Sequence, residues 1–362
     1  MKPTKSELLT IGLFCGFLFI MTALYLFLPK TDFSETEKRY LADSPALSWD
    51  SVASGEWGSE AETYMADHIP GRNFFVGLNA YFDLLTGRQA GKDIRIHGDR
   101  LIEAPVAQDS DAIQRNMASI NSFAQNIDQT VDLMIVPSAG WACGLDGYSD
   151  EAMIADIYAA AEQKIRTVNV TDVFGGHSDL YFKTDHHWNS TGAHAAYRAY
   201  MTLLDREYME SEDFEKAVFG SFQGSTYSRS ALWLTSAEDL ELWYGSENLT
   251  VINAETEGSH EGVFYWERLE EADKYTVFLD GNHSLVRIQN PEKEGKLLVI
   301  RDSYSNSLGC FLAESYGEVV LVDLRYYKQP ISQLATQEAF DNILVCYSIG
   351  NFLTDTNIIW LR

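Results

Sequence analysis

The chain has 362 residues, and its 27 basic and 53 acidic side chains give a formal net charge of −26 at pH 7. Hydrophobic residues make up 46% and aromatic residues 13% of the sequence, enough to bury a sizeable core, which excludes disordered and low-complexity classes. Nucleic-acid binding needs clustered Lys and Arg to neutralise phosphates, so a chain this acidic is not expected to bind nucleic acid.

The chain begins with a long apolar run, because no charged residue occurs from Leu8 to Leu28. As a helix this run would be about 31 Å long, which matches the hydrocarbon thickness of a bilayer and predicts one transmembrane span. A cleavable signal peptide is the alternative, but its apolar region is shorter and is followed by small residues, whereas LFLPK stands at 26–30. Basic residues flank the span on both sides, so the positive-inside rule does not fix its orientation.

After the span, residues 29–92 are expected to form a polar juxtamembrane stalk and a helix that ends near Gly87. Apolar residues then recur at steps of three and four between Ile113 and Ile127, which predicts an amphipathic helix. The apolar run Val131–Val136 ends at Pro137 and predicts a buried strand. Another helical pattern covers Met153–Ile165.

The C-terminal part alternates between short apolar runs and helical patterns. Strands are predicted at 297–300, 319–324 and 343–347, and helices at 308–316 and 334–340. Such βαβαβ alternation predicts an α/β fold with a parallel sheet whose ligands gather at the carboxyl ends of the strands.

Residues 205–290 show a different pattern, in which β-like runs such as 263–266 and 275–279 are interrupted by Gly and Asn. We therefore expect a β-rich insertion at 205–290 within an α/β core formed by residues 93–204 and 291–362. Before the core would come a cytoplasmic tail (1–7), the transmembrane anchor (8–28) and the stalk with its helix (29–92).

The segment 183–189, KTDHHWN, holds the densest group of titratable side chains and precedes a helical pattern over 193–204. Alternate residues of an extended loop face the same side, so Asp185 and His187 can converge while His186 points away. The carboxylate could then accept a hydrogen bond from Nδ1 of His187 and leave Nε2 free as a base. The alternative is a capping loop with surface histidines, in which Asn189, Ser190 or Thr191 caps the helix.

A metal site is a further alternative for this segment. Its ligands would be Asp185, His186, His187 and His194, but no H-x-x-x-H or H-E-x-x-H spacing supports it. The four cysteines show no CxxC pair, so they predict neither a disulfide framework nor a cysteine-based zinc site. We expect no metal and no cofactor.

Ser303 lies in the segment RDSYS, where the strand 297–300 turns into a helix. A serine hydroxyl is a poor nucleophile unless an imidazole takes its proton. Ser303 is therefore a candidate nucleophile only because His187 is available as the base. Its backbone N–H at a helix N-terminus could also stabilise an oxyanion, although Asp302 or Ser303 could simply cap the helix.

Two more polar residues follow predicted strands of the same sheet. Asn351, after the third strand, could be a second oxyanion donor, or Gly350-Asn351 could be an ordinary turn. Arg325, after the second strand, could clamp a substrate or simply pair with Asp323.

Several strings together resemble the bacterial DHHW family, which is similar to the alginate O-acetyltransferase accessory proteins with an SGNH-hydrolase-like fold. The strings are TDHHWN (184–189), RDSY (301–304), VDLRYY (322–327), SETEKR (34–39), YMADHIPGR (64–72) and DGNH (280–283). The strings are distributed over most of the chain after the span, and they occur in the order that is typical of the family.

The resemblance implies a circularly rearranged SGNH fold, in which the Asp-His motif precedes the serine motif and Asp185, His187 and Ser303 form the triad. It also implies substrate or oxyanion contacts from Asn351, Arg325, Tyr304 and His283.

The sequence departs from ordinary SGNH enzymes in three places. Arg301 replaces the glycine of Gly-Asp-Ser, Asp-x-x-His has become Asp-x-His, and Phe352 follows Asn351 where aspartate is usual. The first two departures are typical of the alginate-type relatives, whereas the third puts the oxyanion role of Asn351 in doubt.

The implied function is that of a single-pass, membrane-anchored extracytoplasmic O-acetyltransferase acting on sugar hydroxyls of a secreted or cell-wall polysaccharide. A multi-pass membrane acyltransferase is implied as the partner that supplies acetyl groups. A carbohydrate O-acetyl esterase with the same triad is one alternative. A non-catalytic polysaccharide-binding protein is another, with sugar-stacking aromatic residues drawn from Trp233, Trp243, Tyr244, Tyr265 and Trp266.

Overall fold

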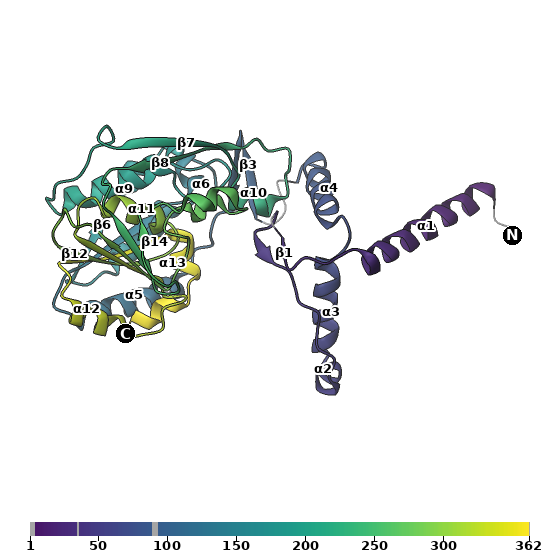
Figure 1. Ribbon diagram of the computed structural model, residues 1–362, viewed down its shortest axis with the longest axis horizontal. Coiled ribbons are helices and arrows are strands. Elements are labelled where there is room, and N and C mark those ends of the chain that lie inside the picture. Colours follow the sequence, from purple (N-terminus) through teal and green to yellow (C-terminus); the bar gives the residue numbers. More distant parts are fainter. Residues whose placement is uncertain (1–3, 35, 89–92, 362) are drawn as a thin grey trace. The chain divides into compact units, whose positions relative to one another are not determined.

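The chain forms two compact units in the computed structural model, which describes residues 4–34, 36–88 and 93–361 (Figure 1). The first unit contains the described residues before position 92 together with Ser228–Leu234. The second contains Asp93–Tyr227 and the residues from Thr235 onward.

The helix α1 (Lys5–Phe27) begins at a capping box. Thr4 Oγ1 accepts a hydrogen bond from the Glu7 N–H (3.3 Å), and the Glu7 carboxylate accepts one from the Thr4 N–H (2.6 Å). None of its side chains is buried. Among the described residues, this helix is long and apolar enough to cross a membrane, which makes it a candidate membrane anchor or signal sequence.

The rest of the first unit brings two of the motif strings together. Arg39, from SETEKR, donates to both carboxylate oxygens of Asp67 (2.5 and 2.9 Å), which belongs to YMADHIPGR. Arg72, from YMADHIPGR, donates to one carboxylate oxygen of Glu37, from SETEKR (2.6 Å). The elements here are β1 (Phe33–Ser34), β2 (Arg39–Tyr40), α2 (Trp49–Ser54), α3 (Glu56–Asp67) and α4 (Arg72–Leu85).

The segment Ser228–Leu234 belongs to this unit because it packs on α4. The Trp233 ring stacks on Phe74, with a centroid distance of 5.9 Å and an interplanar angle of 9°. Tyr81 contacts the same indole and accepts a hydrogen bond from the Leu234 N–H (2.7 Å). Gly77 leaves room for the indole, since a Cβ there would lie 1.9 Å from it.

The second unit is built on an eight-stranded sheet with the order β10-β9-β11-β13-β12-β14-β5-β6. Five of the strands, from β13 to β6 in this order, are parallel. They are β5 (Val131–Val136), β6 (Ile165–Val168), β12 (Lys296–Arg301), β13 (Glu318–Val322) and β14 (Asn342–Ser348). From β12 the chain goes first to β13 on one side and then to β14 on the other, so a topological switch point lies at the end of β12.

Helices cover both faces of this sheet, and each face has its own apolar core (Figure 1). On one face lie α6 (Ala139–Ala142), α8 (Thr171–Phe174), α9 (Ser190–Leu203) and α11 (Ser305–Leu312). On the other lie α5 (Ser110–Gln125), α7 (Asp150–Ala159), α12 (Ile331–Glu338), α13 (Ile349–Thr354) and η4 (Asn357–Leu361). The predicted α/β class with a mostly parallel sheet is confirmed, and so is the C-terminal βαβαβ pattern.

Two predictions for single elements were wrong. The helical pattern at Met153–Ile165 ends earlier, at Ala159, and Ile165 begins strand β6. The runs 263–266 and 275–279 are not strands, since they share only the bridge between Phe264 and Phe278. The first run leads into the 3₁₀ helix η2 (Trp266–Glu270), and the second overlaps the 3₁₀ helix η3 (Lys274–Val277). Their apolar composition reflects burial in the core rather than strand pairing.

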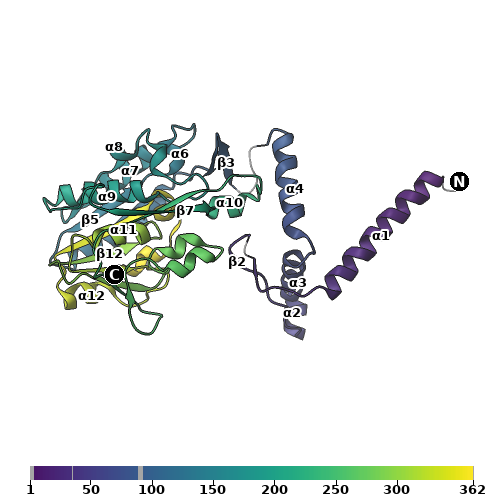
Figure 2. The same cartoon turned by 45° about the horizontal axis from the view of Figure 1, so that its top comes forward.

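The segment 205–290 is β-rich, and part of it extends the central sheet. Strands β9 (Thr250–Asn253), β10 (His260–Glu261) and β11 (Leu285–Gln289) add to the sheet antiparallel, beside β13. A separate hairpin is formed by β7 (Glu215–Phe222) and β8 (Glu238–Tyr244) (Figure 1). The connection from β7 to β8 carries α10 (Ser225–Ser230), which lies beyond the end of β7 (Figure 2). The remaining elements are the hairpin β3 (Ile94–His97) and β4 (Arg100–Glu103), and η1 (Ser178–Leu180).

Candidate active site

The loop that carries the DHHW string is fixed at both of its ends. At its start, the Glu238 carboxylate accepts hydrogen bonds from the backbone N–H groups of Lys183 (2.8 Å) and Thr184 (2.7 Å) and from the Thr184 hydroxyl (2.6 Å). At its end, the buried Trp188 indole donates to the Ser307 hydroxyl (2.9 Å), and Asn189 caps α9 by accepting from the Gly192 N–H (3.0 Å). These contacts restrain both ends of the loop.

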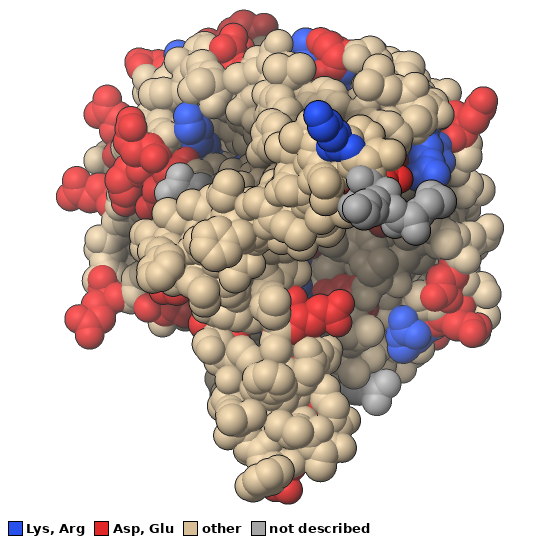
Figure 3. Space-filling view, turned by 90° about the vertical axis from the view of Figure 1, so that its right-hand side faces the viewer, with Lys and Arg blue, Asp and Glu red and all other residues tan. Residues whose placement is uncertain are grey.

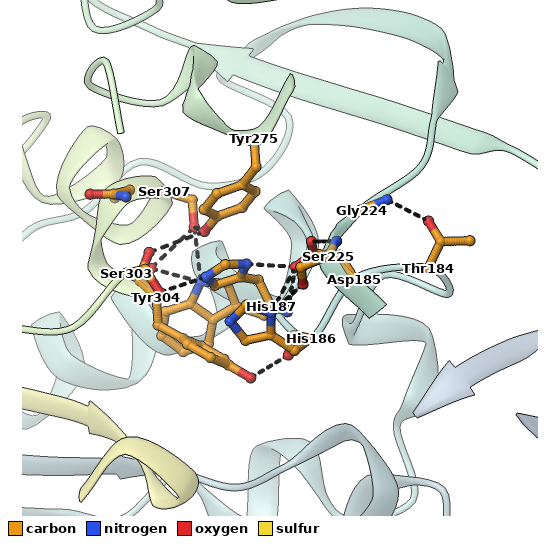
Figure 4. Close-up of polar contacts among 12 residues, drawn as sticks. Thr184, Asp185, His186, His187, Gly224, Ser225, Tyr275, Ser303, Tyr304 and Ser307 are labelled. Atoms are coloured by element: carbon orange, nitrogen blue, oxygen red, sulfur yellow. Dashed lines mark hydrogen bonds and ion pairs between the residues drawn. The ribbon is translucent and has the colours of Figure 1, made fainter. Parts of the chain in front are cut away.

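Three of the predicted residues meet in this loop and beside it (Figure 4). Nδ1 of His187 lies 2.6 Å from Oδ1 of Asp185, and its Nε2 lies 2.8 Å from Oγ of Ser303. All three side chains are buried. The Asp185 carboxylate also accepts from the Ser225 N–H (2.6 Å) and from the His187 N–H (2.9 Å), so both of its oxygens are bound.

The charges of this cluster favour an ionised Asp185 and a neutral His187. Burial on its own would raise the pKa of the Asp185 carboxyl, but the His187 and His186 imidazoles and the hydrogen bonds hold that pKa well below its usual range. The pKa of His187 is lowered, first by burial and then by His186, although the carboxylates of Asp185 and Asp302 oppose this shift. A neutral imidazole with Nε2 facing a hydroxyl can accept its proton.

Ser303 is held at the switch point by its neighbour Asp302. The Asp302 carboxylate accepts from the Tyr304 N–H (3.0 Å) and from the backbone and hydroxyl of Ser348 (both 2.8 Å), which ties the end of β12 to the end of β14. The Asn351 amide also donates to Asp302 (2.8 Å). No described residue accepts a hydrogen bond from the Ser303 N–H, so this donor is free to bind a ligand.

The other predicted substrate residues make contacts within the protein. Arg325 pairs with Asp323 (2.6 Å), as the alternative interpretation expected. The Tyr304 hydroxyl donates to the backbone carbonyl of His186. The two ring nitrogens of His283 lie 3.0 Å from Glu255 and 3.1 Å from Asp280. The roles of Arg325, Tyr304, His283 and Asn351 toward a substrate remain predictions.

Arg301 and the DGNH string meet behind Ser303. The guanidinium of Arg301 is fully buried and donates to the side-chain carbonyl of Asn282 (3.0 Å), which also accepts from the Asn306 amide (3.1 Å). Asp323, from the VDLRYY string, lies 4.0 Å from the same guanidinium. Three motif strings therefore share one buried polar cluster next to the strand end that carries Ser303.

Two contacts that shape the site were not predicted from the sequence. The ring of Tyr275 lies parallel to the His187 imidazole, at a centroid distance of 3.9 Å and an angle of 5°. Gly224 passes so close to Asp185 that a Cβ on it would lie 2.2 Å from the Asp185 Cβ. Both residues come from the segment 205–290, and no periodicity or motif marks either of them.

The metal alternative finds little support in this geometry. Ligand atoms of Asp185, His186 and His187 lie within 4.8 Å of one another, and this is the group among the described residues that could hold an ion. A metal there would displace the hydrogen bond between Asp185 and His187. The fourth predicted ligand, His194, instead bonds the Met209 carbonyl (2.9 Å).

The aromatic residues named for sugar stacking divide by burial. Trp243 and Tyr265 are buried in the core, and Tyr244 packs against it. Trp233 and Trp266 are exposed by 40% and 46%. Trp233 uses one ring face to stack on Phe74. The five residues therefore do not form one exposed aromatic surface.

Comparison with known proteins supports the motif and the fold. Residues 145–322 match the profile of the DHHW protein family, which confirms the predicted resemblance. A DHHW family protein from Eubacterium siraeum is similar in structure, with a TM-score of 0.66, 18% identity, and coverage of 74% of this chain and 93% of that one. A search of curated proteins returned no significant match.

Two further solved structures are similar to this chain. PatB1 of Bacillus cereus, carrying a sulfonyl adduct, has a TM-score of 0.63 and 17% identity over 74% of this chain and 98% of its own. The O-acetyltransferase domain of Pseudomonas putida AlgJ is more distant, with a TM-score of 0.45 and 12% identity over 72% of this chain and 92% of its own. The likeness to the E. siraeum protein and to PatB1 is one of fold.

Proposed function

We propose that this chain, with its DHHW-type domain, is a membrane-anchored extracytoplasmic O-acetyltransferase that acts on sugar hydroxyls of a secreted or cell-wall polysaccharide. The observation that carries the acyl-transfer part is the hydrogen-bonded series Asp185–His187–Ser303, with separations of 2.6 and 2.8 Å. A carboxylate, an imidazole and a hydroxyl in this order are the groups that activate a serine nucleophile. The choice of acetyl group and sugar acceptor rests on the motif resemblance.

In the first half of the proposed reaction, His187 takes the proton of the Ser303 hydroxyl while Oγ attacks the acetyl carbonyl of the donor. Asp185 keeps the imidazole oriented and stabilises its positive charge. The unpaired Ser303 N–H donates to the developing oxyanion, and Asn351 is the proposed second donor. When the tetrahedral intermediate collapses, the bond between the acetyl carbon and the donor's leaving group breaks, and His187 protonates that leaving group. Ser303 then carries the acetyl group as an ester.

In the second half, a sugar hydroxyl replaces the donor. His187 accepts the hydroxyl proton as the sugar oxygen attacks the ester carbonyl, and it returns a proton to Oγ of Ser303 when the ester bond breaks. The products are an acetylated sugar and the free enzyme. Water in place of the sugar would give acetate, which is the esterase alternative.

The acetyl supply and the location belong to the same proposal. Acetyl donors of the cytoplasm do not reach a site outside the membrane unaided, so a multi-pass membrane acyltransferase is proposed as the partner. The candidate span α1 would hold the chain at the same membrane. The proposed contacts of Arg325, Tyr304 and His283 would then orient the acceptor at the strand ends.

The triad can be tested with an activated acetyl ester and an oligosaccharide acceptor. Ser303→Ala and His187→Ala should each lower turnover by roughly 10⁴-fold or more, and the double variant should lose little more, because the residues act as one unit. Asp185→Ala should cost less than either, and His186→Ala should keep most activity. Ester activity that survives Ser303→Ala, or that depends on His186 more than on His187, would overturn the assignment.

The same assay separates the competing functions. Acetylated oligosaccharide as the main product supports the transferase, whereas free acetate as the only product supports the esterase. A serine-reactive phosphonate should label Ser303 in either case. Failure of labelling in a folded chain would favour a non-catalytic binding protein.

A further inference from the structure

The imidazole of His187 is covered on both faces by aromatic rings. Tyr275 lies parallel to it at a centroid distance of 3.9 Å, and His186 lies at 3.8 Å with an angle of 37°. Two rings this close to one centroid cannot share a face, so they occupy opposite faces (Figure 4). Tyr275 is 4% exposed, whereas the His186 side chain is 24% exposed, so Tyr275 forms the closed wall of the site.

We propose that Tyr275 is a positioning residue of the acyl-transfer reaction, whose ring holds His187 and favours its charged form while its hydroxyl fixes the Ser303 turn. The inference rests on the proposed function, because it concerns the base and the nucleophile of that reaction. It assigns a task to a residue that lies outside every motif string.

The hydroxyl of Tyr275 connects the base to the nucleophile. It donates to the backbone carbonyl of Ser303 (3.3 Å) and lies 3.3 Å from the Ser307 hydroxyl. Burial raises the pKa of Tyr275 well above its usual value, so the phenol stays protonated and remains a donor. One rigid side chain therefore contacts the imidazole with its face and the serine backbone with its edge.

The ring face matters because His187 becomes positively charged twice in each reaction cycle. The face of an aromatic ring is negative and attracts a nearby cation. The other charged or titratable groups that face His187 are Asp185 and His186 from its own loop, Asp302 from the end of β12, and Tyr304 from the turn before α11. Of these, the two carboxylates favour the imidazolium, and His186 opposes it.

The segment after Tyr275 has a constrained conformation. Leu279 and Asp280 have φ values of 58° and 64°, in the left-handed region that disfavours both residue types. Such strain persists only where the surrounding structure over-determines the conformation. Phe278 packs against the Tyr275 ring at a centroid distance of 5.2 Å, so the phenol has little room to rotate away.

Two variants of the full-length chain in detergent test this inference. Tyr275→Phe keeps the ring and loses the hydroxyl, and Tyr275→Leu loses both. The cation–π contact accounts for roughly a 2- to 30-fold effect, and Tyr275→Leu also removes the hydroxyl, so this variant should lower kcat about 10- to 100-fold. It should also move the titration of His187 to lower pH. Tyr275→Phe should keep the titration and lose about threefold to tenfold in kcat, with KM unchanged.

The chain offers a matched control in Tyr265, which stacks on His260 at 3.8 Å and 13° in the same insertion. Tyr265→Leu should lower stability without moving the His187 titration. The titration is followed by NMR on chains labelled at histidine, so it remains informative even if no acyl transfer is found and the proposed function fails.

Two results would overturn the inference. One is a Tyr275→Leu chain with the wild-type His187 titration and kcat. The other is an equal loss of kcat in Tyr275→Phe and Tyr275→Leu with no shift in titration, which would reduce the ring to packing. If Tyr275→Leu does not fold, Tyr275→Phe still tests the role of the hydroxyl. An unchanged kcat in Tyr275→Phe would contradict the proposal that the hydrogen bond from the Tyr275 hydroxyl to the Ser303 carbonyl fixes the Ser303 turn.

Discussion

The proton balance of His187 determines what this site can do at the scale of single residues. Burial and the neighbouring His186 disfavour its positive charge, while the carboxylates of Asp185 and Asp302 favour it, and the net result is a lowered pKa. An imidazole in this state is neutral at neutral pH and can act as a base without first losing a proton. The site is therefore ready to accept the Ser303 proton before any substrate binds.

A pH profile should report this balance. Because the base works only in its neutral form, kcat/KM should fall as pH drops through the pKa of His187, with the inflection below the usual value of about 6.5. Asp185→Asn removes a charge that favours the imidazolium, so its inflection should move to still lower pH while the maximal rate falls. Rates measured from about pH 4 to 9 with a non-ionising ester check both points, and an inflection above 7 would contradict them.

How much of the site the sequence predicts depends on where each contact originates. The spacing of Asp185 and His187 and the strand-end position of Ser303 are local features, and the structure places these three side chains together. The same spacing argument was wrong about His186, whose ring does not point away but lies 3.8 Å from the His187 ring. The contacts of Tyr275 and Glu238 depend on the path of the segment 205–290, which no local pattern encodes. Long-range packing of this kind becomes visible only in the folded chain.

At the scale of elements, the turn between β7 and α10 acts as a brace for Asp185. The chain passes over the carboxylate at Gly224, and the next residue donates its N–H to Oδ2. Strand β5 and the C-terminal βαβαβ unit were predictable because their patterns are continuous, whereas the four-residue β6 was hidden by the helical pattern before it. The brace lies in the less regular part of the chain, so only the structure reveals it.

Replacing Gly224 by Ala should disturb this brace. The new Cβ would lie 2.2 Å from Cβ and 2.3 Å from Oδ2 of Asp185, so the Ser225–Asp185 hydrogen bond has to yield. We expect turnover to fall at least about tenfold, because loss of the orienting group lowers the effectiveness of His187. Gly220→Ala, on strand β7 of the same hairpin, is the control, since its Cβ would meet only Asp239 at 3.8 Å. Equal turnover in the two variants would contradict the proposed role of Gly224 beside Asp185.

The packing of Trp233 on α4 can be tested in the same way. A Cβ on Gly77 would lie 1.9 Å from the indole, so Gly77→Ala should expel Trp233 and destabilise the first unit. Gly58→Ala, in α3, meets no atom within 4 Å and should stabilise its helix by about 0.5–1 kcal/mol. Thermal unfolding and indole fluorescence follow the two changes, and a stabilised Gly77→Ala chain with unchanged fluorescence would refute the packing argument.

At the scale of the whole molecule, neither unit is a single continuous stretch of the chain. The second unit is interrupted after Tyr227, the segment Ser228–Leu234 belongs to the first unit, and the second unit resumes at Thr235. The net charge of −26 applies to the whole chain, and on the face shown in Figure 3 the charged side chains are mostly acidic. Removing residues 1–92 would leave Ser228–Leu234 without α4, so a test of the membrane anchor should remove α1 alone.

The last prediction concerns this anchor. Deleting residues 1–30 should move the protein from the membrane fraction to the soluble fraction and leave ester hydrolysis intact, because the described contacts of Asp185, His187 and Ser303 all lie beyond Asp93. An apolar span with a charge near its centre inserts poorly, so Leu18→Arg should act in the same direction within the full-length chain. The mass of the wild-type chain from membranes separates an anchor from a cleaved signal peptide, since only the anchor keeps residues 1–30. A reporter fused after Arg362 that works only in the cytoplasm would overturn the proposed topology, and a soluble wild-type chain of full mass would overturn the anchor.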